Sequence, residues 1–87
     1  MHTPKIKTAI ALNDHVLLIE FDNQQRKIYD VTPLLSRAMF EPLKNKLLFN
    51  SVSVEQGGYA VAWGSEIDIS EYELWQHGKN YSENISF

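Results

Sequence analysis

The sequence contains no cysteine, which excludes disulfide scaffolds, thiolate metal sites and thiol catalysis. It also lacks any apolar run that approaches the roughly 20 residues of a membrane-spanning helix. No secretory signal is visible, because the first residues lead into an alternating segment instead of a continuous apolar stretch. Together these absences predict a soluble cytoplasmic protein.

Clusters of basic residues are absent as well. The eight lysines and arginines are scattered, and 11 acidic residues bring the formal net charge to −3. A chain of this kind is not expected to bind nucleic acid directly. Phosphate-binding glycine loops and a serine nucleophile elbow are also missing. His2, His15 and His77 do not have the spacing typical of metal ligands. We therefore predict that the protein binds no metal or cofactor and is not an enzyme.

Alternating apolar positions predict five strands in the 87 residues, at 5–12, 15–21, 26–31, 51–55 and 59–63. In the first strand the alternation predicts one buried face that contains Ile6, Thr8, Ile10 and Leu12. The second strand is apolar on both faces, so we expect it to lie centrally in the sheet. A short extended piece is expected around Asp68.

Two helical segments are predicted between and after the strands. Thr32-Pro33 is typical of a helix start, with Thr32 as the cap, and Pro42 is expected to break the helix that follows. Ser70 and Glu73 fit a capping box, in which Ser70 caps the last helix at 71–77 and Glu73 reaches back. Gly78 ends that helix.

The expected order is therefore β-β-β-α-β-β-α, an α+β fold. It consists of a small antiparallel meander or hairpin sheet with one or two short helices packed on it. Residues 1–78 form a single domain in this interpretation. The polar tail 79–87 is expected to be either frayed or docked on a partner chain.

Five residues are assigned structural roles. Asp22 is expected to bond backbone amides in a turn, and Asp30 to orient the start of the helix. Asp68 is expected to bond backbone or Ser70, which caps the last helix. Trp63 is predicted to lie in the core, although an interface role is the alternative.

Exposed aromatic residues near the C-terminus are the candidate contact residues, because Trp and Tyr are enriched in interface hot spots. We expect Leu74 and Tyr72 to face the sheet, with Trp75 near the edge of that apolar stripe. The predicted contact surface consists of Tyr72, Trp75, Tyr81 and Phe87.

The order of these anchors resembles a family of small bacterial proteins, the domain of unknown function 2442. The resemblance covers residues 5–78, and its segments are short and mostly structural. It rests on Leu17, Phe21, Asp22, Arg26 or Lys27, Asp30, Pro33-Leu34-Leu35, Phe40, Leu43, Phe49, Val52, Val54, Val61, Trp63, Asp68, Ile69, Ser70 and Leu74. Two turns differ: Asn23-Gln24-Gln25 replaces a glycine turn, and Gly64 lies directly after Trp63.

The resemblance implies an accessory or partner-binding role, because family members occur fused to helix-turn-helix domains or beside another small protein in a toxin–antitoxin-like arrangement. Our leading hypothesis is a protein-interaction module that self-associates or binds a second small protein, as an antitoxin-like partner would. The alternative is the sensing or dimerising domain of a transcriptional regulator, without DNA contacts of its own. A small-ligand-binding or enzymatic domain is the third hypothesis.

Overall fold

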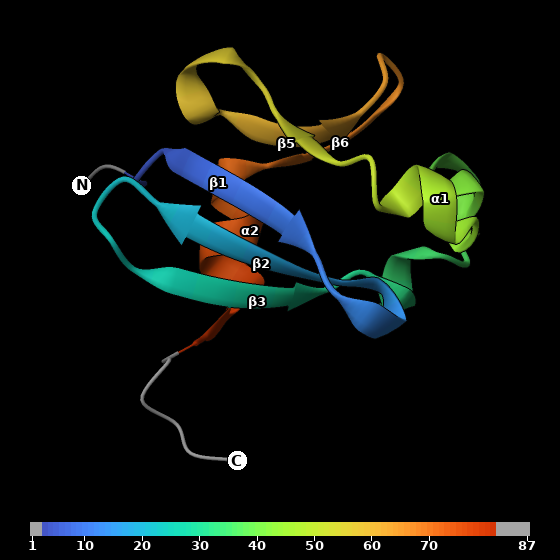
Figure 1. The fold of residues 1–87 in the computed structure, drawn as a ribbon, viewed down its shortest axis with the longest axis horizontal. Coiled ribbons are helices and arrows are strands. Elements are labelled where there is room, and N and C mark those ends of the chain that lie inside the picture. Colours follow the sequence, from blue (N-terminus) through green and yellow to red (C-terminus); the bar gives the residue numbers. More distant parts are fainter. Residues whose placement is uncertain (1–2, 82–87) are drawn as a thin grey trace.

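Two antiparallel sheets and one helix enclose the core of the protein in its computed structural model, which describes residues 3–81 (Figure 1). The first sheet has the strand order β1-β2-β3-β7, with β1 at Ile6–Ala11, β2 at Val16–Phe21, β3 at Arg26–Asp30 and β7 at Lys79–Asn80. The second sheet has the order β4-β5-β6, with β4 at Ser53–Val54, β5 at Ala60–Trp63 and β6 at Ile67–Ser70. Helix α2, at Glu71–His77, packs on the inner face of the first sheet.

The α+β class and the broad order of elements are confirmed. The strands form two sheets, however, because the middle of the chain separates β3 from β4. Residues 79 and 80 of the predicted tail form β7, which pairs with Lys27 and Ile28 of β3. Residues 82–87 lie outside the described part of the chain.

Strand β2 supplies the centre of the core. Leu17, Ile19 and Phe21 alternate along it, and all three side chains are fully buried. Tyr29 of β3 and Val31 lie on the same inner face. These side chains pack against α2, whose Leu74 is also fully buried. Burying a large aliphatic side chain contributes about 1.5–3 kcal/mol, so this layer is a main source of stability.

The predicted buried face of β1 is wrong beyond Ile6. The pairing of β1 with β2 shifts by one residue between Ile6 and Thr8, as happens at a β-bulge. Because side chains alternate between faces, a shift of one residue moves every later side chain to the other side. Ile6 is buried, but Thr8 and Ile10 are exposed. Ala9 and Ala11 pack against the core in their place.

The segment after β3 begins with short 3-10 turns in place of the predicted helix, η2 at Thr32–Leu34 and η3 at Ala38–Lys44. Thr32 is not the cap. Asp30 Oδ1 accepts a hydrogen bond from Thr32 N at 2.9 Å, so Asp30 orients the turn. The Thr32 hydroxyl lies 3.4 Å from the backbone oxygen of Asp14 instead. Pro42, inside η3, lacks the N–H that a longer α-helix needs there, so the segment stays in short turns.

A one-turn helix, α1 at Lys46–Phe49, follows η3. Its cap is Asn45, whose Oδ1 accepts hydrogen bonds from Leu47 N and Leu48 N at 2.9 and 3.4 Å. The helix carries Phe49 into the core, where the Phe49 ring stacks on Trp63 with centroids 5.9 Å apart. Trp63 is only 2% exposed, and its Nε1 donates to the Phe49 backbone oxygen at 2.8 Å. This contact links the middle segment to the second sheet.

The last helix is capped by Ser70, whose Oγ accepts a hydrogen bond from Glu73 N at 3.1 Å. The second half of the predicted capping box is wrong. The Glu73 carboxylate does not reach back along the chain; its Oε2 accepts a hydrogen bond from Tyr29 OH at 2.9 Å. Tyr29 on β3 thus binds the Glu73 carboxylate, which the capping-box spacing assigned to the start of the helix. The bond ties α2 to the first sheet.

Candidate interaction face

The first sheet has an outer face, opposite the side that α2 covers (Figure 1). Alternation and register assign nine side chains to this outer face: Thr8, Ile10, Val16, Leu18, Glu20, Arg26, Ile28, Asp30 and Lys79. Within the described residues, Figure 1 shows no helix or strand over this face of the sheet.

An apolar row crosses the middle of the outer face. Ile10 lies opposite Leu18, and Leu18 lies opposite Ile28, so the three side chains are cross-strand neighbours. Ile10 is 52% exposed, and Leu18 and Ile28 are half-buried. Single exposed apolar residues are common on protein surfaces, whereas a contiguous apolar row on a solvent-facing sheet is typical of a contact surface.

Charged and polar side chains flank the apolar row. On one side, Glu20 lies opposite both Thr8 and Arg26, and a shallow hollow of about 150 Å³ lies among them. On the other side, Val16 lies opposite Asp30. Along β3, the cation Arg26 and the anion Asp30 thus lie on opposite sides of the apolar Ile28.

Two of the predicted contact residues lie on α2, on the other side of the sheet. Tyr72 does not face the sheet as expected; it is 60% exposed, and Leu74 alone of the residues of α2 is buried. Trp75 is half-buried and packs edge-on against Phe21 with centroids 5.0 Å apart. Lys27 Nζ lies 4.2 Å from the centroid of the Trp75 ring. Trp75 therefore supports the core, and Tyr72 remains a candidate contact residue.

The other two predicted contact residues lie toward the end of the chain. Tyr81 N donates to the Arg26 backbone oxygen at 3.0 Å, which places Tyr81 beside β3 at the margin of the outer face. Phe87 lies outside the described residues. The structure therefore brings Tyr81 to the outer face and separates it from Tyr72 and Trp75.

Two aspartates, Asp22 and Asp68, do not make the hydrogen bonds that the sequence predicted for them. In the turn after β2, Asn23 Oδ1 and not Asp22 accepts the local hydrogen bond, from Gln25 N at 3.0 Å. Asp68 is exposed on β6, opposite Ala62, and among the described residues its side chain bonds neither of the two expected partners, backbone or Ser70. Its side chain points out of the strand pair, because Ile67 and Ile69 take the buried positions on either side.

A polar cluster joins β3 to α2. Glu73 Oε2 accepts the hydrogen bond from Tyr29 OH and lies 3.1 Å from His77 Nδ1. Burial is the main reason that the pKa of Tyr29 is raised above its ordinary value. The hydrogen bond to Glu73 and the negative charge of Glu73 raise the pKa further, and the positive charge of Arg37 opposes them.

We expect this cluster to make folding sensitive to alkaline pH. A raised pKa in the folded state means that the stabilisation is complete below the unfolded pKa of about 10 and is lost as pH rises toward the folded value. The free energy of unfolding should fall above about pH 10, with a limiting slope of about 1.4 kcal/mol per pH unit from Tyr29. Urea unfolding of Tyr29→Phe should lack this part of the slope. An identical slope in Tyr29→Phe would contradict the prediction.

The described part of the chain has neither a metal-ligand cluster nor a membrane-spanning helix. Among residues 3–81, no group of three or more His, Asp or Glu side chains is placed to hold a metal ion. No helix in that same part of the chain is long and apolar enough to cross a membrane.

Comparison with known protein families gives a match. Residues 6–80 match the family described as "protein of unknown function (DUF2442)". The chain belongs to this family. The resemblance predicted from the order of the anchors is thereby confirmed, over nearly the same residues. No curated protein and no solved structure matches the chain.

Membership of DUF2442 covers both sheets and α2, because the match extends from the first residue of β1 to the last residue of β7. The outer face is thus contained in the family domain. The apolar row does not follow from the alternation in the first strand, because the bulge in β1 reverses the side chains after Ile6. The available signal was the second strand, where Leu18 is apolar on the face opposite Leu17 and Ile19.

Proposed function

We propose that this DUF2442 protein is a protein-interaction module that self-associates through its outer face. The observation that carries the proposal is the apolar row of Ile10, which is exposed, and Leu18 and Ile28, which are half-buried; the row lies in register across three strands. Burying this row against a second copy would remove apolar surface that a small domain cannot cover by itself. The proposal includes a bacterial, cytoplasmic setting and assigns the chain no catalytic role.

Charge complementarity favours a second copy as the occupant. In a two-fold dimer with its axis along the apolar row, each strand lies over its own copy, and the rows of the two sheets coincide. Arg26 then lies over the partner's Asp30, and the same pair forms twice by symmetry. Aligned sheets cross at about 30°, which keeps these positions close.

The other two-fold arrangement is less favourable. With the axis parallel to the strands, Glu20 would lie over the partner's Glu20, and like charges would face each other in the interface. In the favoured arrangement the like charges are those of Lys79, at the margin of the sheet. Its long side chain can direct the ammonium group into solvent there.

The mass of the protein in solution tests this proposal. We expect the wild-type chain to have twice its chain mass of 10.0 kDa in sedimentation equilibrium. Leu18→Gln places an amide at the centre of the apolar row of each copy and should weaken dimerisation about a hundredfold. The matched control is Leu47→Gln on α1, where the side chain is already 83% exposed, and this variant should remain dimeric.

A charge exchange in the same measurement tests the arrangement of the two copies. Arg26→Glu and Asp30→Lys should each weaken self-association, because each creates like-charge pairs in a homodimer. A mixture of the two variants should form heterodimers, since both cross pairs are again of opposite sign. A monomeric wild-type chain would overturn the proposal. Dimers that survive Leu18→Gln would place the interface elsewhere on the molecule.

The same outer face would serve the alternative function, a dimerising domain of a transcriptional regulator, or the binding of a second small antitoxin-like partner. The isolated chain should show no salt-dependent binding of DNA in any of these cases, because it carries a net charge of −3 and scattered basic residues. A retarded DNA band that weakens as salt rises would replace the proposal with direct DNA recognition.

A further inference from the structure

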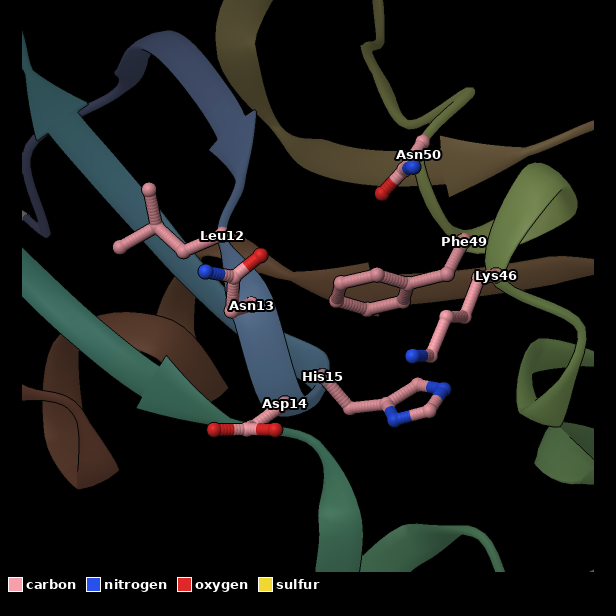
Figure 2. A pocket seen from close by; sticks show the side chains of 7 residues that line it. All are labelled: Leu12, Asn13, Asp14, His15, Lys46, Phe49 and Asn50. Carbon is pink, nitrogen blue, oxygen red and sulfur yellow. The ribbon is translucent and has the colours of Figure 1, made fainter.

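A polar pocket lies between the β1–β2 turn and α1, away from the outer face (Figure 2). Its volume is about 260 Å³. The turn contributes Leu12, Asn13, Asp14 and His15, and the α1 region contributes Lys46, Phe49 and Asn50. Residues more than 30 positions apart in the sequence therefore form its two walls. The space is large enough for a small anion or a small metabolite, but not for a peptide.

The turn wall is held in an unusual backbone conformation. Asp14 and His15 are consecutive non-glycine residues with φ of 61° and 62°. Such left-handed conformations cost roughly 1–2 kcal/mol each, so surrounding contacts must hold them in place. Val31 N donates to the His15 backbone oxygen at 2.9 Å, and Leu12 N donates to the Val16 oxygen at 2.7 Å. The wall is thus fixed before any ligand binds.

The His15 ring fastens the turn to the opposite wall. Its Nε2 lies 2.8 Å from the Leu43 backbone oxygen, which only accepts, so Nε2 carries the proton and donates. The ring also contacts Phe49, with centroids 5.0 Å apart and an angle of 58° between the planes. His15 therefore acts as a support at the base of the pocket and keeps its two walls apart at a fixed distance.

The groups that face the space favour an anion. Figure 2 shows the Lys46 ammonium directed into the space between the walls, and the Asp14 carboxylate directed away from it. Within the described residues, no carboxylate lies within salt-bridge distance of Lys46 Nζ. The amides of Asn13 and Asn50 stand at opposite sides of the space and are exposed. An exposed amide can turn either its oxygen or its NH₂ group toward a ligand.

We propose that this pocket binds a phosphate group, either as free inorganic phosphate or as the phosphate of a small monoester. Lys46 supplies the charge, and the Asn13 and Asn50 amides supply hydrogen-bond donors. The rigid turn fixes their separation. The proposal is independent of self-association, because no residue of the pocket belongs to the outer face.

Nuclear magnetic resonance titration of the full chain tests the pocket. Inorganic phosphate and glycerol phosphate are added separately, with sodium chloride at matched ionic strength as the reference. We expect saturable shifts of the Asn13 and Asn50 side-chain amide signals with one or both phosphates and none with chloride. Tighter binding of glycerol phosphate would assign the ligand as a monoester, and equal binding would assign it as the phosphate group alone.

Two lysine variants separate a built site from general attraction to positive charge. Lys46→Gln should weaken phosphate binding about tenfold, which corresponds to the loss of one charge-assisted hydrogen bond. Lys44→Gln removes the same charge from an exposed residue of η3 outside the pocket and should leave the affinity unchanged. Equal weakening in both variants, or shifts that do not saturate, would overturn the proposal.

Discussion

Gly58→Ala is expected to destabilise the fold by about 3–4 kcal/mol. Gly58 has φ of +75°, and a Cβ atom at this position would lie 2.5 Å from the backbone oxygen of Ile6 and 2.9 Å from its nitrogen. The left-handed conformation alone costs roughly 1–2 kcal/mol for alanine, and forcing an atom against backbone adds about 1–3 kcal/mol. Because β1 starts at Ile6, the turn η4, at Gln56–Gly58, would have to move away from the first sheet.

Gly64→Ala is the matched control for this prediction. Gly64 has nearly the same backbone conformation, with φ of +69°, but no heavy atom would lie within 4 Å of an added Cβ. This variant should lose only about 1–2 kcal/mol, the cost of the conformation. The midpoint of urea unfolding measures both changes. Equal losses in the two variants would show that the close approach of Gly58 to Ile6 does not hold in solution.

Trp63→Ala is expected to remove about 4 kcal/mol, a large part of the 5–15 kcal/mol that stabilises a typical domain. The Trp63 ring is buried, stacks on Phe49 and donates its Nε1 hydrogen bond to the Phe49 backbone oxygen. Alanine would leave a cavity between the second sheet and α1 and remove one of two hydrogen bonds to the Phe49 oxygen, which still accepts from Val52 N at 3.3 Å. Urea unfolding followed by circular dichroism measures the loss without relying on tryptophan fluorescence.

Two further variants separate the contributions of Trp63. Trp63→Phe keeps an aromatic ring against Phe49 but removes the Nε1 donor, so it should lose about 1–3 kcal/mol. Trp75→Ala removes the other tryptophan, which is only half-buried, and should lose about 2 kcal/mol. If Trp75→Ala lowered the free energy of unfolding as much as Trp63→Ala, the result would mean that α2, and not α1, closes the core.

Most of the elements could be predicted because their signals are local. The alternation of Leu17, Ile19 and Phe21 defines a strand whatever packs against it, since side chains in a strand alternate between faces. The glycines of the β4–β5 turn supply the positive φ that the turn needs, and Ser70 caps the helix that starts directly after it. Each of these features depends on residues within about four positions of each other.

The candidate sites could not be predicted, because contacts between distant residues decide them. Nothing in the sequence around Lys7 marks the bulge that turns Ile10 outward, since the bulge results from the pairing of β1 with β2. The Glu73 carboxylate accepts a hydrogen bond from Tyr29 instead of capping the helix, because a buried hydroxyl requires an acceptor. The pocket at His15 exists only because Leu43 and Phe49 fold back onto the first turn.

The sequence by itself therefore determined the α+β class, the strands of the meander, the start of the last helix and membership of the family. Those properties follow from short-range periodicity and from the order of the anchors along the chain. Only the tertiary structure decided which face of the first sheet is left uncovered and which polar groups line a pocket. Both depend on strand register and on long-range packing, and a shift of one residue in the register reverses the exposed face.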